Sequence, residues 1–174
     1  MTILKVINHN YNDENSITQL YSYIMNPNKL LHGVYGSNLL YTQLGGSYIA
    51  KQINYVSQFY GKTGNLVKHY IISYDDATEN MPLEQILHSF ILSINHLDTY
   101  PFFYALHENT DHLHFHLAIG AVNAYTRKKY PDTKETHEHL RSNLHYFTSF
   151  YIPHPNKKNK NTLFIPGCKL VYSN

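Results

Sequence analysis

Several residue types are scarce in this 174-residue chain, and each scarcity excludes a class of protein. The single cysteine, Cys168, excludes an internal disulfide and a cysteine-rich zinc site, which suits a reducing compartment. No segment approaches the roughly eighteen apolar residues of a membrane span, since the best candidate, FILSI at 90–94, has only the size of a core segment. The N-terminal segment lacks the apolar centre and cleavage site of a secretory signal. We therefore expect a cytoplasmic protein.

Charge is also sparse, which limits what bulk electrostatics can do. Only 15% of the residues are charged and the formal net charge is +2, so the whole chain exerts no strong attraction on polyanions. Any nucleic-acid binding must come from local patches. Hydrophobic residues make up 43% of the chain, enough to bury one core, so we expect a single domain over residues 1–174.

The hydrophobic pattern mixes strands and helices without regular alternation. A helix capped by Asn15 or Ser16 should end before Pro27, and residues 32–47, which contain four glycines, resemble an extended loop that could face a substrate. The class is α+β: a central antiparallel sheet that carries a His-x-His strand, with helices packed over one face. The remaining expected strands are 2–7, 67–74, 102–107, 113–122 and 163–172, and the remaining helices are 49–60, 83–94 and 134–150.

Thirteen histidines make any single one uninformative, so spacing has to carry the argument. His114 and His116 project from the same face of a strand, while Phe115 between them faces the other side. A hairpin brings His107, at the end of the preceding strand, beside the pair. Three neutral imidazoles leave coordination positions open, as in a catalytic metal site that acts as a Lewis acid on a phosphoryl oxygen.

Other interpretations of the histidines stay open. Imidazole ligands suit Zn, Mn, Fe or Ni better than Mg, so the ligands do not fix the metal. The His-x-His pair could also be a half-buried polar pair without a metal. His112 and His69 could support the metal ligands from outside or be purely structural.

The segment HENTDHLHFHLAIGAVN at 107–123 resembles the three-histidine motif of the relaxase and mobilisation nuclease family, within the HUH endonuclease superfamily. The match is residue for residue at His107, His114, His116 and Asn123. KHYIISYDD at 68–76 and YIMNPNK at 23–29 are similar to two further blocks of the family, in the same order. The family often has an acidic residue shortly after the first histidine, a place taken here by Asn109 and Thr110, with Glu108 and Asp111 nearby.

The resemblance implies a metal-dependent endonuclease and strand transferase that nicks single-stranded DNA at a transfer origin during mobilisation or conjugation of a mobile genetic element. It implies a divalent ion, Mn or Mg first and Zn or Ni as alternatives, and accessory transfer proteins as further partners. The attacking tyrosine would form a 5′-phosphotyrosyl link, and the free 3′ hydroxyl could later reverse the reaction.

Two tyrosines compete for the role of nucleophile. Tyr21 falls on the apolar stripe of the first helix with Ile17 and Ile24, which indicates a core position. Tyr23 lies off that stripe and resembles the family's nucleophile, so it is the preferred candidate, with Tyr11 third. Tyr23 could also be an ordinary surface tyrosine, since 17 tyrosines are present.

Two small basic clusters could contact DNA phosphates or simply be solvated. Tyr35, Tyr41 and Tyr48 could stack on unpaired bases or pack within the protein. A rolling-circle replication initiator, with Tyr146 or Tyr151 as nucleophile, is the nearest rival function, and a non-cleaving DNA-binding metal protein is another. The basic clusters consist of Arg127, Lys128 and Lys129, and of Lys157, Lys158 and Lys160.

Overall fold

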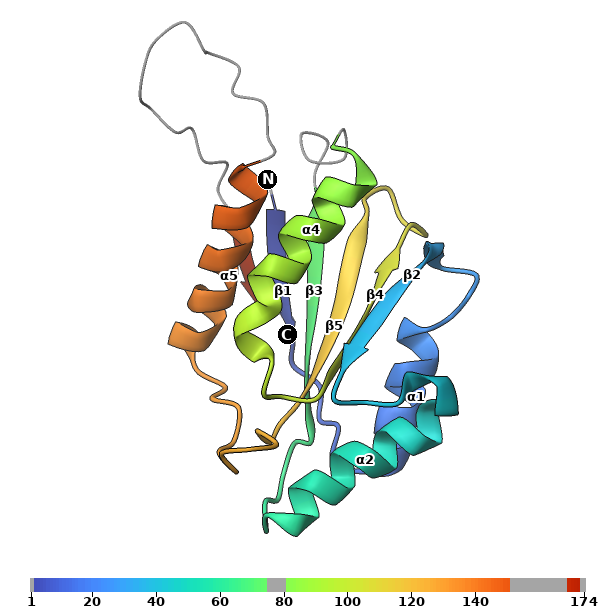
Figure 1. Cartoon of the computed structure of the whole chain (residues 1–174), viewed down its shortest axis with the longest axis vertical. Coiled ribbons are helices and arrows are strands. Elements are labelled where there is room, and N and C mark those ends of the chain that lie inside the picture. Colours follow the sequence, from blue (N-terminus) through green and yellow to red (C-terminus); the bar gives the residue numbers. More distant parts are fainter. Residues whose placement is uncertain (1, 75–80, 151–168, 173–174) are drawn as a thin grey trace, which may run out of the picture.

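The computed structural model describes residues 2–74, 81–150 and 169–172 (Figure 1). The strands are β1 (Thr2–Ile7), β2 (Leu30–Asn38), β3 (Val67–Tyr74), β4 (Phe102–His107), β5 (His114–Gly120) and β6 (Lys169–Tyr172). The helices are α1 (Glu14–Ile24), α2 (Gly46–Phe59), α4 (Leu83–Ile94) and α5 (Lys134–Ser149), with short 3-10 turns at Thr42–Leu44 and Asn95–Leu97.

The strands form one sheet in the order β2-β4-β5-β3-β1-β6. Every pairing is antiparallel except that of β6, which runs parallel to β1 at one edge. The predicted hairpin is present, because β4 and β5 pair with His107 opposite His114 and Ala105 opposite His116. The predicted α+β class with an antiparallel sheet carrying the His-x-His strand is confirmed.

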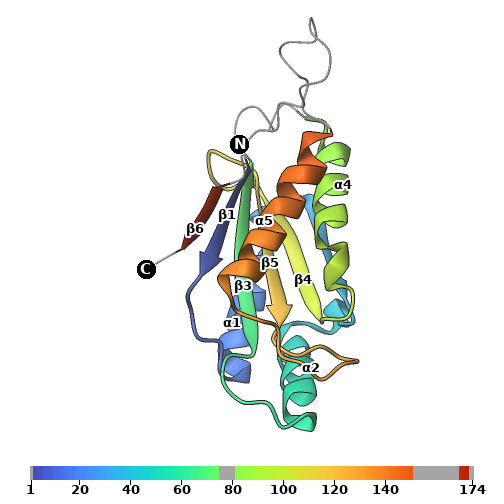
Figure 2. The same cartoon turned by 90° about the vertical axis from the view of Figure 1, so that its left-hand side faces the viewer.

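Helices cover both faces of the sheet. α4 and α5 pack over one face, as expected, and α1 and α2 form a second layer against the other (Figures 1 and 2). Phe115 faces the α4 side, where its ring stacks on Phe90 with centroids 3.9 Å apart. Ala118 and Phe103 face the α1 and α2 side. β5 is therefore buried along its whole length, and its two faces are chemically different.

Two local predictions were wrong. The loop expected at 32–47 contains β2, which pairs with β4 after an irregularity between Leu30 and Tyr35. Glycine there serves packing as well as turning, because a Cβ on Gly36 would lie 2.5 Å from the Tyr104 hydroxyl oxygen. The cap of α1 is Asp13, whose carboxylate accepts from the backbone N–H of Ser16 at 2.8 Å, and neither Asn15 nor Ser16 holds that position. Of the strand expected at 163–172, residues 163–168 lie outside the described part.

Candidate metal centre and active site

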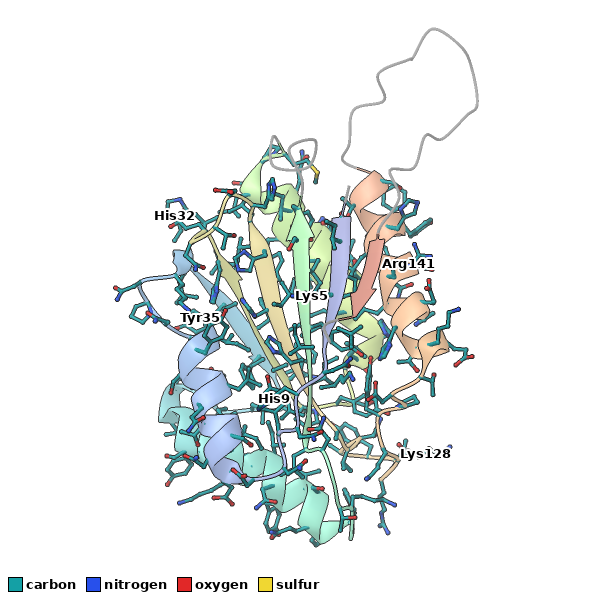
Figure 3. The ribbon with its side chains drawn as sticks, turned by 180° about the vertical axis from the view of Figure 1, so that it is seen from behind. Lys5, His9, His32, Tyr35, Lys128 and Arg141 are labelled. Carbon is teal, nitrogen blue, oxygen red and sulfur yellow. The ribbon has the colours of Figure 1, made fainter. Side chains whose placement is uncertain are left out.

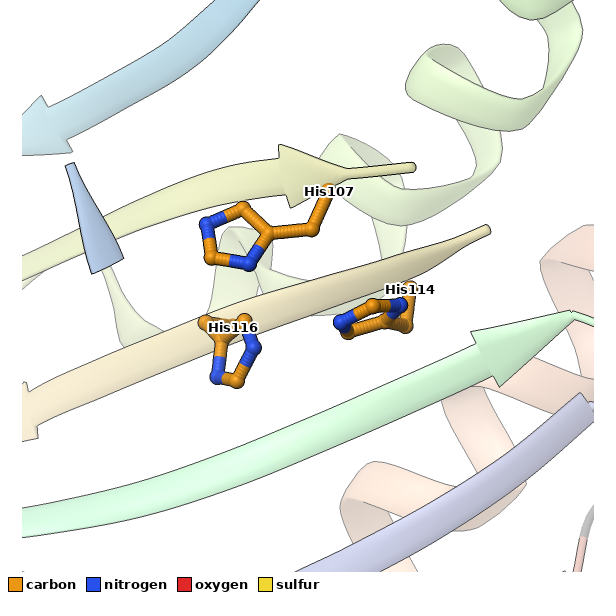
Figure 4. Close-up of side chains that lie close together, drawn as sticks. All are labelled: His107, His114 and His116. Atoms are coloured by element: carbon orange, nitrogen blue, oxygen red, sulfur yellow. The ribbon is translucent and has the colours of Figure 1, made fainter. Parts of the chain in front are cut away.

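Three histidines meet on the α1 side of the sheet. His107 ends β4, while His114 and His116 begin β5, and all three are buried. One nitrogen from each ring can be chosen so that all lie within 4.8 Å of one another (Figure 4). The spacing argument thus predicted correctly that the three imidazoles converge.

Hydrogen bonds fix which nitrogen two of the rings present. His107 Nε2 donates to the carbonyl of Ile24, at 2.6 Å, and His114 Nδ1 donates to the carbonyl of His112, at 3.0 Å. The opposite nitrogens, His107 Nδ1 and His114 Nε2, therefore keep free lone pairs. Within the described residues, His107 Nδ1 and His116 Nε2 are buried and have no hydrogen-bond partner. Buried polar atoms are normally satisfied, so these two nitrogens fit metal ligands.

His69 and Tyr11 form a chain of contacts behind His116. Its Nδ1 lies 3.0 Å from His69 Nε2, and His69 Nδ1 lies 3.1 Å from the Tyr11 hydroxyl. If His116 Nε2 binds a cation, its Nδ1 carries the proton and donates to His69, and His69 Nδ1–H then donates to Tyr11. The sequence left His69 undecided and considered Tyr11 only as a nucleophile. His69 shares the strand face of His116 only through the register in which β3 pairs with β5, which the sequence does not reveal.

Burial keeps these rings neutral. Desolvation, followed by the neighbouring His69, lowers the pKa of His116 to about 2. Desolvation, followed by the charge of His9, lowers the pKa of His69 to about 3. It also lowers the pKa values of His107 and His114. No proton therefore has to be displaced from the free lone pairs before a cation binds at neutral pH.

Tyr23 lies beside this cluster. Its ring centroid is 5.2 Å from that of His116 and 6.1 Å from that of His107, and the side chain is 45% exposed. Tyr21 points elsewhere: its hydroxyl donates to the carbonyl of Thr42 at 2.8 Å and its ring packs on Phe103. Of the two competing tyrosines, Tyr23 is the one next to the histidines and open to solvent.

Lys29 supplies a positive charge that the sequence argument missed. Its Nζ lies 3.8 Å from the centroid of the Tyr23 ring. Its backbone carbonyl accepts from the N–H of Glu108 at 3.0 Å, which ties this residue to the chain just after His107. The ammonium contributes to the lowered pKa values of all three clustered histidines. A phosphate beside Tyr23 would be attracted by this charge. The only signal in the sequence was its place in the YIMNPNK block.

An open pocket of about 390 Å³ adjoins the cluster between α1 and the β1–β3 part of the sheet. Figure 3 shows this side of the molecule, with Lys5 on β1 and His9 beyond its end. A substrate thus has room beside the tyrosine and the histidines. The pocket is lined by Ile7, His9, Tyr11, Ser16, Gln19, Leu20, Tyr23, His69, Ile71 and His116.

Comparison with known protein families matches residues 23–147, well over half of the chain, to the relaxase family described as MobA/VirD2-like, nuclease domain. The chain belongs to this family. No curated protein and no solved structure matches it significantly. The match extends from Tyr23 through the three histidines to α5, and it supports DNA nicking as the general function of this relaxase.

This relaxase departs from the family pattern near the first histidine. Glu108 and Asp111, the two acidic alternatives, are both exposed, and neither joins the histidine cluster found among the described residues. Thr110 lies there instead: its hydroxyl donates to the carbonyl of His112 and lies 3.2 Å from His114 Nδ1. A neutral hydroxyl therefore supports His114.

Other predicted residues of the relaxase lie away from the cluster. Asn123 is buried in the turn after β5, where its side chain donates to Thr99 and accepts from the N–H groups of Tyr125 and Thr126.

The basic residues Arg127, Lys128 and Lys129 follow in that turn and are exposed, beyond the end of β5 opposite to His114. Lys157, Lys158, Lys160 and Tyr151 lie outside the described residues.

Among the described helices, none combines the length and apolar character needed to cross a bilayer.

Proposed function

We propose that this relaxase nicks single-stranded DNA at a transfer origin and transfers the cut strand through a phosphotyrosine on Tyr23. His107, His114 and His116 would hold a divalent cation through His107 Nδ1 and the Nε2 atoms of the other two. The observation that carries the proposal is the position of the Tyr23 ring, which lies against two of the three histidines whose free nitrogens converge.

The chain's own residues account for most of the chemistry. The Tyr23 oxygen attacks phosphorus and loses its proton, the P–O bond to the 3′ oxygen breaks, and that oxygen takes up a proton to become a free 3′ hydroxyl. The 5′-phosphotyrosyl bond keeps the energy of the broken ester, so the 3′ end of a strand can reverse the step. Lys29 attracts the phosphate, and His69, in contact with Tyr11, orients His116. A bound cation would polarise the phosphoryl oxygen.

The ligand set and the family do not determine which metal is bound, and we propose Mn or Mg in the cell, with Zn or Ni as alternatives.

We further propose a single domain over residues 1–174, a cytoplasmic role in mobilisation or conjugation of a mobile element, and accessory transfer proteins as partners. Arg127, Lys128 and Lys129 remain proposed DNA contacts away from the nick. Lys157, Lys158 and Lys160, outside the described residues, also remain proposed DNA contacts. The alternative function, a non-cleaving DNA-binding metal protein, applies if the chain binds DNA without cutting it.

The rolling-circle initiator is the weaker alternative. Its candidate Tyr146 lies on α5, which packs on the face of the sheet opposite to the histidines. The Tyr146 ring contacts Phe147 and Phe150. A phosphate on the histidine side would therefore be separated from Tyr146 by the sheet.

Denaturing electrophoresis tests the proposal with labelled single-stranded DNA carrying the transfer origin and Mn²⁺ or Mg²⁺. We expect a covalent protein–DNA band that disappears in Tyr23→Phe and in His114→Ala. Tyr21→Phe is the matched control and should keep the band, since its hydroxyl is bound to Thr42. A band that survives Tyr23→Phe but not Tyr146→Phe or Tyr151→Phe would favour the initiator. DNA binding without any band would favour the non-cleaving protein.

A further inference from the structure

A ridge of exposed aromatic rings runs along α2, a helix that contributes no residue to the pocket beside the histidines. Tyr48, Tyr55 and Phe59 lie on the side of the helix opposite to its buried residues and are 52%, 66% and 67% exposed. Tyr55 and Phe59 stack with centroids 6.0 Å apart, and Phe59 meets Tyr60 edge-on at 5.1 Å. We call these four residues the aromatic ridge. A contiguous run of exposed rings, unlike singly exposed apolar residues, is a candidate binding surface.

The ridge is joined to the basic turn formed by Arg127, Lys128 and Lys129. The Arg127 guanidinium lies over the Tyr60 ring, 5.3 Å from its centroid, and the Tyr60 hydroxyl donates to the carbonyl of Ala124 at 2.9 Å. Lys129 Nζ donates to the carbonyl of Thr63. Lys128 projects at the same end of the molecule as α2 (Figure 3). Two segments distant in sequence thus form one surface.

The two segments that form this surface carry charge of one sign only. Residues 46–66 and 121–130 contain Lys51, Lys62 and the three cations of the basic turn, and no aspartate or glutamate. Glu14 on α1 adjoins this surface, and its carboxylate oxygen accepts from the side-chain amide of Asn54 at 2.8 Å. In a chain with net charge of only +2, this concentration of cations is the kind of local patch that a polyanion requires.

We propose that the aromatic ridge and the basic turn bind single-stranded DNA distant from the nick, with bases stacked on the rings and phosphates against the cations. This inference rests on the proposed function, because it assigns a second contact region to the same substrate. Flat aromatic faces accept any unpaired base, and the guanidinium over Tyr60 adds a cation beside a stacking surface. Lys51 Nζ likewise lies over the Tyr48 ring, 6.0 Å from its centroid, so a cation accompanies the ring at each end of the ridge.

Fluorescence anisotropy with a labelled dT30 oligonucleotide tests this surface in the Tyr23→Phe background, where no cleavage intervenes. The double substitution Tyr55→Ala/Phe59→Ala should weaken binding about tenfold or more, because two stacking surfaces are lost. Replacing Arg127, Lys128 and Lys129 with Gln should reduce the slope of log affinity against log salt by about 2.

The matched control is Tyr146→Ala/Phe150→Ala at the C-terminal end of α5. This pair has the same residue types and spacing and is 53% and 57% exposed, but its helix carries acidic residues and lies on the other face of the sheet. Binding should stay within twofold, and circular dichroism melting should confirm that every variant folds. Equal effects of the two double substitutions, no effect of the ridge substitution, or no dT30 binding at all would each overturn the inference.

A parallel adduct assay, with Tyr23 intact, separates this inference from the proposed function. Loss of dT30 affinity in the ridge variant with no adduct from any protein would contradict the proposed function alone. If the adduct forms but the ridge substitution leaves the affinity for dT30 unchanged, only the inference about the aromatic ridge is contradicted.

Discussion

His107, His114 and His116 each have a hydrogen-bond partner at one ring nitrogen, and one nitrogen of each ring lies within 4.8 Å of the others. The partners differ in kind, since two are backbone carbonyls and the third is the ring of His69. A carbonyl can only accept, so it fixes the tautomer outright. His69 can donate or accept, so its own contact with Tyr11 decides how firmly His116 is oriented.

Removal of the His69 ring should therefore weaken metal binding. We expect His69→Ala to lower the affinity for Mn²⁺ or Zn²⁺ about 10–100-fold, measured by calorimetric titration, because His116 loses the acceptor for its Nδ1 proton. His69→Gln should recover part of the loss, since its amide oxygen can accept that proton.

The control is His139→Ala, an exposed histidine on α5 that contacts the His96 ring. The affinity of this variant for Mn²⁺ or Zn²⁺ should match that of the unmodified protein. Unchanged affinity in His69→Ala would show that the ring does not orient the ligand.

The buried histidines also predict acid instability of the metal-free protein. The pKa values of His69 and His116 are about 3 and about 2 in the folded state, below the ordinary value of 6.5. Between these values the unfolded chain binds protons that the folded chain does not, so stability falls as pH drops below about 6.5. The loss is at most about 1.4 kcal/mol per pH unit for each such histidine.

Urea unfolding at pH 7.5, 6.5 and 5.5 measures this loss. His69→Gln should flatten the decline by removing one of the titrating groups. A free energy of unfolding that stays constant or rises from pH 6.5 to 5.5 would contradict the burial of neutral histidines.

At the scale of elements, α1 links the nucleophile to the ligands. Its final turn carries Tyr23, and the carbonyl of Ile24 accepts the hydrogen bond from His107. The carbonyls of a last helical turn lack partners within the helix, so this bond satisfies one of them while it fixes the ligand. One contact thus ties the end of the helix that carries Tyr23 to the ring of His107.

The other end of α1 is held by its capping box. Asp13→Ala should lower the free energy of unfolding by about 1 kcal/mol, because the N–H of Ser16 loses its acceptor. Thermal melting should show a decrease of roughly 2–4 °C. Asn12→Ala, at the neighbouring exposed position, should leave the melting temperature unchanged, and an equal decrease in both variants would contradict the capping role.

The elements also show what the sequence could predict. The hairpin and its three histidines follow from strand alternation and from the length of the turn, both of which are local. β2 could not be found this way, because its glycines indicate a loop and its pairing comes from β4, about seventy residues later. His69 and Tyr11 were ambiguous for the same reason: their roles depend on contacts between strands and segments distant in sequence.

At the scale of the whole molecule, the sheet separates two surfaces. The α4 and α5 face contains the larger apolar cluster, which includes Phe90 and Phe115 under the His-x-His strand. The other face is only partly covered by α1 and α2, and it carries the histidines, Tyr23 and the open pocket. The apolar face keeps β5 in place, and the polar face is left free for the substrate.

The most direct measurement of the central claim is to locate the covalent link. The protein is reacted with transfer-origin single-stranded DNA and metal, digested with nuclease and protease, and analysed by fragmentation mass spectrometry. The account predicts a nucleotide adduct in the peptide that spans Tyr11, Tyr21 and Tyr23, with fragment ions that assign it to Tyr23. An adduct on Tyr146, Tyr151 or any tyrosine other than Tyr23 would contradict it.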